Sequence, residues 1–462
     1  EDLLYKWRFV QTANVDPAVR ADSLPTAIFQ QGLAYAIAHE VGHTLGLEHN
    51  MADSAAFATD SLRNAAFTRK YGTTASIMDY ARFNYVAQPG DKGVRLTPPE
   101  LGEYDYFAID WNYRYYPQYA GKFDDETKAI EAMTDKAVKN PHLRFMPTQS
   151  RIIDPTVVAE DLGDDPIKAA EYGKKNLAGI QRNLATWIKN DDDSRKKQEL
   201  NLAIAKQYHL YFKNVLNLVG GIVCNTAKAN TGIPPYKVLP KARQREAFLW
   251  TIKEVKNFTD HADRKAERKD YMAVSYYDQL LEFLIRDLFN SRARVIMAQT
   301  LDPKSYTLRE YFDDLYGQVF ASTIAGRTPT HIEQLLEQTF LNQAEAAVSG
   351  GSSKAAPTVP TALAGSDATD LYFDLVNRFG TVPTELKNQL FTENVQFGNP
   401  AQSPYPTFSI SSHDNSDLYY QAALVKLRPV MARRAASAGT PDLKAHYSIM
   451  LQKIDKALDD KK

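Results

Sequence analysis

The sequence predicts a mainly α-helical protein with a small α/β part at its N-terminal end. From about Phe123 onward the chain is persistently helical in character and strand-like alternation is scarce, as in DPIKAAEYGKKNLAGIQRNLATWIK and MAVSYYDQLLEFLIRDLFNS. The stretch LLYKWRFV, residues 3–10, instead alternates with a period of two, and a helix is predicted soon after it within TAIFQQGLAYAIAHEVGHTLG. Together these observations predict one strand and one helix before a long helical region.

The composition is that of an ordinary globular protein. The 462 residues carry a formal net charge of −1, with 44% hydrophobic and 24% charged residues, and this length accommodates two or three domains. A near-neutral charge argues against nucleic acid as a partner, because phosphate binding needs a net basic face. No apolar run approaches the roughly 20 residues of a transmembrane helix. The single cysteine, Cys224 in LVGGIVCNT, excludes a disulfide framework and predicts a buried, inert thiol.

The first predicted elements are a strand and the start of a helix. In residues 3–10 the alternation places Lys6 and Arg8 on the side opposite the apolar residues, as in a half-buried strand. Ser23 then has the side chain of a helix N-cap, and Pro25 suits the first turn of the helix that follows.

The helix that follows has an apolar repeat and a clear end. Ile37, Val41 and Leu45 recur every four residues and predict its buried stripe. Gly46 predicts its end, because glycine accepts the left-handed backbone conformation that closes helices. Residues 71–93, YGTTASIMDYARFNYVAQPGDKG, are rich in turn formers and are predicted not to be helical.

A further helix and a low-complexity segment complete the predicted organisation. TPPELGEYDYFAIDWNY predicts a helix with Thr97 as its cap and with Pro98 and Pro99 in its first turn. SGGSSKAAPTVPTALAG, residues 349–365, has the composition of a linker or loop within the helical region. The predicted units are an N-terminal domain, a helical domain, a linker and a C-terminal helical region, at residues 1–117, 118–348, 349–366 and 367–462.

Residues 36–50, AIAHEVGHTLGLEHN, hold three histidines with the spacing of a metal site. On a helix His39 and His43 lie about 6 Å apart along the axis on one face, so both imidazoles can point at one metal at about 2.0–2.1 Å. Glu40 is rotated by roughly 100° and can reach a water at the metal, while Gly46 turns the chain and lets His49 return as a third ligand. Three protein ligands leave a coordination position open, which is typical of a catalytic zinc (Zn²⁺) site. Histidines of an amphipathic helix without metal are the alternative, but this pattern arises by chance only about once in a hundred thousand chains.

The stretch HEVGHTLGLEH matches the H-E-x-x-H-x-x-G-x-x-H signature of the metzincin zinc peptidases, which the chain therefore resembles. The resemblance implies that Met78, in TASIMDYARF, forms an apolar floor under the imidazoles and binds no metal itself. It implies that Tyr80 approaches the zinc or stabilises the tetrahedral intermediate, as in astacin-like and serralysin-like members, and a core tyrosine is the alternative. It also implies hydrolysis of peptide bonds with Glu40 as the general base.

Three stretches resemble, more narrowly, a family of large bacterial, envelope-associated, zinc-dependent metallopeptidases with flanking domains mostly of unknown function. They are HEVGHTLGLEHN, SIMDYARFNYVAQPGD and GEYDYFAIDWNYR, the close resemblance covers about residues 1–116, and residues 154–177 resemble that family's region after the peptidase domain. This resemblance implies a location outside the cytoplasm, in the periplasm, in the outer envelope or secreted. Asn50 differs from the Ser, Glu, Pro or Asp of better-known metzincin branches, so no specificity carries over, and the calcium repeats of serralysins are absent.

Metzincins place a twisted sheet before the zinc helix, and its edge strand pairs with the extended substrate. Only 38 residues precede His39, so the resemblance implies a truncated metzincin-like domain that lacks most of its upstream sheet. The chain begins at Glu1 without a signal-peptide pattern, as expected of a processed product or a fragment. Two functions remain open: a zinc endopeptidase acting on proteins or peptides, and a non-catalytic envelope scaffold or binding protein that retains the zinc site. The intact Glu40 favours the first.

The other candidate sites are weaker. The remaining histidines, which are far apart in sequence, are predicted to be ordinary surface or core residues: His142, His209, His261, His331, His413 and His446. The acidic clusters at residues 159–165 and 190–194 match no EF-hand loop and are predicted to be helix caps and solvated loops. The aromatic stretch at residues 104–119 is predicted to pack as a helix behind the active site rather than to bind sugar or peptide by stacking.

Overall fold

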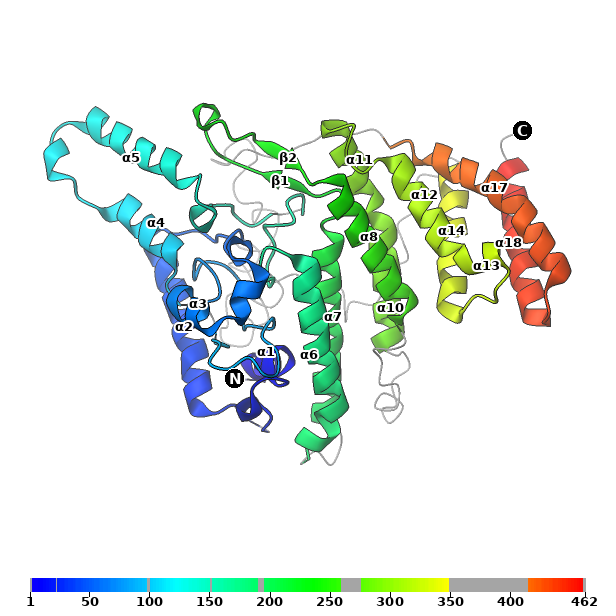
Figure 1. The fold of residues 1–462 in the computed structure, drawn as a ribbon, viewed down its shortest axis with the longest axis horizontal. Coiled ribbons are helices and arrows are strands. Elements are labelled where there is room, and N and C mark those ends of the chain that lie inside the picture. The colour runs from blue at the N-terminus through cyan, green and yellow to red at the C-terminus, as the bar shows by residue number, and fades with distance from the viewer. Residues whose placement is uncertain are drawn as a thin grey trace, which may run out of the picture.

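The protein is mainly α-helical, and most of its helices stand side by side in a long row (Figure 1). The computed structural model describes residues 2–21, 23–97, 100–149, 152–189, 195–258, 276–348 and 414–459. Its helices are α1 Asp2–Thr12, α2 Thr26–Thr44, α3 Ala65–Tyr71, α4 Glu103–Tyr113, α5 Phe123–Ala137, α6 Pro166–Trp187, α7 Arg195–Leu216, α8 Lys241–Lys256, α10 Tyr276–Asn290, α11 Arg292–Leu301, α12 Leu308–Val319, α13 Ala321–Ala325, α14 His331–Val348, α17 Ser416–Ser437 and α18 Pro441–Asp459. The row from α6 to α18 follows roughly the order of the chain. The N-terminal elements lie beyond α6, at the end of the row opposite α18.

The predicted strand at residues 3–10 is wrong, because these residues belong to helix α1. Tyr5 and Phe9 lie one helical turn apart and are both buried where α1 packs on α6 and α7. Arg8 is also buried, and its guanidinium donates to the carbonyl of Leu96 and pairs with Asp16. A strand would need a partner strand for its backbone, whereas a helix satisfies its own hydrogen bonds and presents the aromatic pair to the core.

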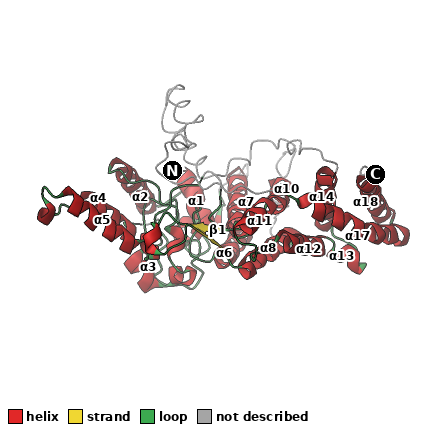
Figure 2. Cartoon of the chain, turned by 90° about the horizontal axis from the view of Figure 1, so that it is seen from above, coloured by secondary structure: helices red, strands yellow, loops and turns green. Residues whose placement is uncertain are grey.

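The small β part lies instead between α7 and α8, as Figure 2 shows near the middle of the molecule. Strands β1 (Ile222–Cys224) and β2 (Tyr236–Val238) pair in antiparallel fashion, with Ile222 opposite Val238. Cys224 is buried in this sheet, and burial raises the pKa of its thiol to about 12. The prediction of a buried, inert thiol is therefore confirmed.

Helix α2 forms where it was predicted, but its N-cap residue and its buried face differ from prediction. It begins at Thr26 after Pro25, without a side-chain cap, so Ser23 does not cap it. The predicted buried stripe is wrong: Ile37, Val41 and Leu45 are 55%, 48% and 39% exposed.

The face of α2 that is buried carries Gly32, His39 and Gly42. Two glycines allow other chain segments to approach this face closely: a Cβ built on Gly32 would lie 2.6 Å from the Leu4 side chain, and one on Gly42 would lie 2.5 Å from Met78 Sδ. The interior face is thus selected by the space that glycine leaves for its neighbours, and the apolar repeat points outward.

The loops around α2 and α4 behave partly as predicted. Gly46 has φ +80° and follows the last residues of α2, as predicted. Of residues 71–93, which were predicted not to be helical, only Tyr71 lies in a helix, as the last residue of α3. Helix α4 begins at Glu103 rather than near Thr97, because Asp105 accepts the backbone N–H of Gly102 at 2.7 Å and so closes the first turn there. Pro98 and Pro99 lie outside the described residues.

The predicted helical region is confirmed over the residues described beyond Phe123. Its C-terminal helices pack as a bundle in which α17 and α18 contact each other and α14. Phe340 of α14 lies against Phe320 and Tyr420 with ring centroids 5.2 and 5.3 Å apart. The predicted linker at 349–366 lies outside the described residues. None of the helices described is long and apolar enough to span a bilayer.

Candidate metal centre

Three histidine side chains come together at the end of α2. His39 and His43 lie one turn apart on this helix, and the turn at Gly46 brings His49 back toward them. One ring nitrogen from each of the three lies within 4.8 Å of the others, and the Nε2 atoms of His43 and His49 are 3.1 Å apart. In the part of the chain that the structure describes, no other three His, Cys, Asp or Glu side chains converge this closely.

Backbone carbonyls determine which nitrogen of two imidazoles is protonated. His39 Nδ1 lies 2.6 Å from the carbonyl oxygen of Ile77, and His43 Nδ1 lies 2.9 Å from that of Leu47. Because a carbonyl oxygen only accepts, both Nδ1 atoms carry the proton and donate it. In the neutral form of each imidazole, the Nε2 atoms of His39 and His43 therefore present bare lone pairs, the form in which imidazole binds a metal.

The electrostatics of the site favour neutral imidazoles. Burial lowers the pKa of His39, although its hydrogen bond to Ile77 opposes this shift. Burial, reinforced by the neighbouring His39 and His43, lowers the pKa of His49 to about 3. At neutral pH the imidazoles of His39 and His49 are thus uncharged, and metal binding requires no proton to be removed from them.

The donor set fits a zinc ion. Zinc–nitrogen bonds of about 2.0–2.1 Å at tetrahedral angles place two ligand nitrogens roughly 3.3 Å apart, close to the 3.1 Å between His43 and His49 Nε2. Three nitrogens leave a fourth tetrahedral position without a protein ligand. The arrangement therefore suits a metal that keeps an open position.

Met78 packs against the helix that carries His39 and His43. Its side chain is fully buried against Gly42 of α2, and its carbonyl accepts the backbone N–H of Asn50 at 3.1 Å. The turn that contains Met78 is thus attached both to helix α2 and to the residue that follows the third histidine.

Tyr80 and Glu40 border the same centre. The Tyr80 hydroxyl lies 2.9 Å from His49 Nε2, a nitrogen that faces the other histidines. Glu40 is exposed on α2, and its carboxylate is near enough to His39 to oppose the lowering of the pKa of that imidazole. A tyrosine hydroxyl and a solvent-facing carboxylate therefore lie beside the three imidazoles.

A comparison with known families matches residues 21–326 to the family described as Met-zincin. The chain belongs to the Met-zincin family. The match covers helix α2 with its two histidines, the turn with Met78 and the helices through α13. The metal centre of this Met-zincin therefore lies near one end of the matched region. Comparisons with curated proteins and with solved structures gave no match.

A network of buried carboxylates behind the Met-zincin centre was missed by sequence reasoning. Asp79 accepts the backbone N–H of Ser54 at 2.6 Å, and the hydroxyl of Ser54 donates to Asp161 at 2.6 Å. Burial raises the pKa of Asp79 to about 7 and raises that of Asp161 well above its usual range. The prediction of a solvated loop at residues 159–165 is wrong for Glu160 and Asp161, which are buried, although Asp165 caps α6 as predicted. In the sequence, the feature that could have indicated this network is the position of Asp79 between Met78 and Tyr80.

The other candidates lie away from this centre. The remaining described histidines join no metal-binding group: His142 pairs with Glu103, His209 with Asp287 and His446 with Glu337, and His331 begins α14. His261, His413 and the acidic cluster at 190–194 lie outside the described residues.

The aromatic stretch of α4 packs behind the site along one face only. Ala108 and Ile109 lie in a cluster with Leu47 and Met78, as predicted for a supporting helix. Contrary to that prediction, four aromatic side chains of residues 104–119 are exposed: Tyr106, Trp111, Tyr113 and Tyr115.

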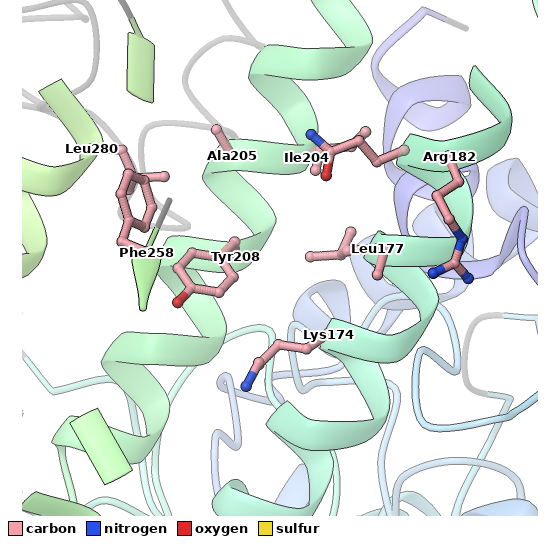
Figure 3. A pocket seen from close by; sticks show the side chains of 10 residues that line it. Lys174, Leu177, Arg182, Ile204, Ala205, Tyr208, Phe258 and Leu280 are labelled. Carbon is pink, nitrogen blue, oxygen red and sulfur yellow. The ribbon is translucent and has the colours of Figure 1, made fainter. Parts of the chain in front are cut away.

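A separate pocket of about 230 Å³ lies between α6 and α7 (Figure 3). Its lining is mostly apolar, with Leu177, Ile204 and Phe258 among the side chains. The ammonium group of Lys174 at its edge is paired with Glu254 at 2.6 Å. The pocket contains none of the residues of the metal centre.

Proposed function

We propose that this Met-zincin is a zinc-dependent metalloendopeptidase. The observation that carries the proposal is the convergence of His39, His43 and His49, two of them with Nε2 lone pairs set by backbone carbonyls. An exposed carboxylate at Glu40 and the hydroxyl of Tyr80 beside His49 supply the remaining groups that peptide hydrolysis needs.

The three imidazoles would hold the zinc. Zinc, when bound, supplies a Lewis acid that lowers the pKa of a water and polarises a peptide carbonyl. Glu40 accepts the proton of the attacking water and passes it to the departing amine, so one carboxylate acts first as base and then as acid. The hydroxyl of Tyr80 donates a hydrogen bond to the oxygen on which negative charge develops.

The substrate class in this proposal is a protein or peptide chain. The carboxylate of Glu40 faces solvent, where a polypeptide can reach it. We also place the activity outside the cytoplasm, a part of the proposal that rests on the resemblance of HEVGHTLGLEHN and SIMDYARFNYVAQPGD to envelope-associated metallopeptidases. Cell fractionation with detection of the chain tests this location.

The experiment that tests the activity measures zinc content and peptide cleavage on the same preparations. We expect about one zinc per chain and cleavage of fluorescence-quenched peptides by the unmodified protein. Glu40→Ala should retain zinc and lose cleavage, whereas His43→Ala should lose zinc. Full cleavage by Glu40→Ala would refute the mechanism.

The second function, a non-catalytic scaffold that keeps the metal for stability, predicts a different result in the same assay. Zinc would be bound, its removal by a chelator would lower the melting temperature, and no peptide in the library would be cleaved. The cleavage assay therefore separates the two functions.

A further inference from the structure

The first histidine of the metal centre is connected to a buried carboxylate of α4 by a chain of hydrogen bonds. His39 Nδ1 donates to the carbonyl of Ile77 at 2.6 Å. The N–H of Met78 donates to the hydroxyl oxygen of Ser76 at 2.9 Å, and this hydroxyl donates to Asp105 Oδ1 at 2.5 Å. Because the carbonyl of Ile77 and the N–H of Met78 are the two ends of one peptide group, the three bonds form a continuous path.

Every bond in this path points the same way. The carbonyl of Ile77 can only accept, so the proton lies on His39 Nδ1. The Ser76 oxygen accepts from Met78, and its own proton goes to Asp105 Oδ1, one of two carboxyl oxygens that together accept three hydrogen bonds here. Hydrogen bonds aligned head to tail polarise one another, and a carboxylate at the accepting end makes the imidazole at the donating end a stronger base.

The carboxylate at the end of the path is held rigidly. Asp105 is buried, and its second oxygen accepts the backbone N–H groups of Gly102 at 2.7 Å and Ile77 at 3.0 Å. These bonds tie the start of α4 to the loop before Met78, so the orientation of the carboxylate relative to the Ile77–Met78 peptide cannot change freely. A rigid acceptor keeps the imidazole in one tautomer and one orientation.

We propose that Asp105 is a positioning residue that acts through Ser76 and the Ile77–Met78 peptide to hold His39 as an Nδ1–H tautomer with its Nε2 directed at the metal. The proposal rests on the proposed zinc site and deepens it, because it assigns a role at that site to a side chain on a helix more than sixty residues away in sequence. Direct carboxylate–histidine pairs are the usual form of such support, and here one peptide group and one hydroxyl stand between them.

The test uses two variants that break the path at different bonds. Ser76→Ala removes the hydroxyl without changing charge, and Asp105→Asn removes the charge but keeps an oxygen for the N–H groups of Gly102 and Ile77. Zinc alone is the probe, and its affinity is measured by competition with a chromophoric chelator. We expect each variant to bind zinc about 10- to 100-fold more weakly. The double variant should bind zinc no more weakly than the weaker-binding single variant, because both substitutions interrupt the same path.

A matched control separates positioning from general stability. Ser54 makes a buried hydroxyl-to-carboxylate bond of similar length, 2.6 Å to Asp161, behind the same turn but outside the path. Ser54→Ala should lower the melting temperature about as much as Ser76→Ala and leave zinc affinity unchanged. Folded Ser76→Ala and Asp105→Asn proteins with wild-type zinc affinity would overturn the proposal.

A second readout does not depend on metal. The ¹⁵N chemical shifts of His39 in the metal-free chain distinguish the two tautomers, and we expect the Nδ1–H form in the wild type and in Ser54→Ala. In Ser76→Ala and Asp105→Asn the Ile77–Met78 peptide loses the support of this path at the Met78 N–H, so its carbonyl can turn away from His39. A mixture of tautomers in these two variants supports the path, and an unchanged pure tautomer overturns it. A wild-type chain that binds no zinc would contradict the proposed function, while the tautomer of His39 would still decide whether the path exists.

Discussion

Met78 packs its sulfur against the backbone of Gly42, so closely that a Cβ at position 42 would lie 2.5 Å from Sδ. This contact joins the turn behind the metal centre to the helix that carries His39 and His43. A side chain as small as a methyl group at position 42 would displace either the helix or the turn, because Met78 is fully buried and has no solvent to move into.

We therefore expect Gly42→Ala to destabilise the protein. Overpacking destabilises by about 1–3 kcal/mol, and the higher helix propensity of alanine offsets about 1 kcal/mol of this. The free energy of unfolding measured by chemical denaturation should therefore fall by about 1 kcal/mol. In a Met78→Ala background the same substitution should be neutral or stabilising, because the space is then free. An equal loss in both backgrounds would show that the contact with Met78 is not the cause.

The outward apolar stripe of α2 gives a prediction about which face of the helix is buried. Ile37→Ala should change the free energy of unfolding by less than about 0.5 kcal/mol, because Ile37 is largely exposed. Leu47→Ala, at a buried position packed against Met78, should cost about 2–5 kcal/mol. Urea denaturation of both variants checks this, and a large loss for Ile37→Ala would mean that this face is covered in solution.

The buried carboxylate of Asp79 predicts a dependence of stability on pH. Burial raises its pKa to about 7 in the folded chain, against 3.8 for the unfolded group. The stabilising contribution of the protonated form is complete below pH 3.8 and is lost as pH rises through 7. A shift of about three units corresponds to at most about 4 kcal/mol.

The measurement is the free energy of unfolding between pH 4 and pH 8, compared for the wild type and Asp79→Asn. The wild type should lose more stability over this range than the variant, because asparagine does not titrate. Burial also raises the pKa of Asp53 and Asp161, so the variant keeps a smaller dependence of the same sign. Identical pH profiles would contradict the raised pKa of Asp79.

Tyr80 gives a prediction about rate rather than metal binding. Tyr80→Phe removes the hydroxyl that lies 2.9 Å from His49 Nε2 while leaving the three imidazoles in place. Zinc content should stay at one per chain, and kcat for peptide cleavage should fall about 10²- to 10³-fold, as expected for the loss of one donor to a developing oxyanion. A variant with unchanged kcat would leave Tyr80 as a packing residue.

The sequence by itself determined the elements of the metal centre that follow from local backbone geometry. Residues four apart on a helix share a face, and a glycine with positive φ reverses the chain, so the convergence of His39, His43 and His49 needed no knowledge of the rest of the fold. The helical character beyond Phe123 was likewise readable, because it depends on the composition and pattern of each segment.

The tertiary structure alone decided which surfaces are buried and which residues meet across the chain. Residues 3–10 form a helix because α6 and α7 receive its aromatic pair, and α2 buries its glycine face because Met78 lies there. The path from His39 to Asp105 depends on α4 standing behind the Met78 turn. Periodicity shows that a segment has an apolar face, but the energy of burial depends on the segments that lie opposite, and their positions are set by contacts between residues far apart in the chain.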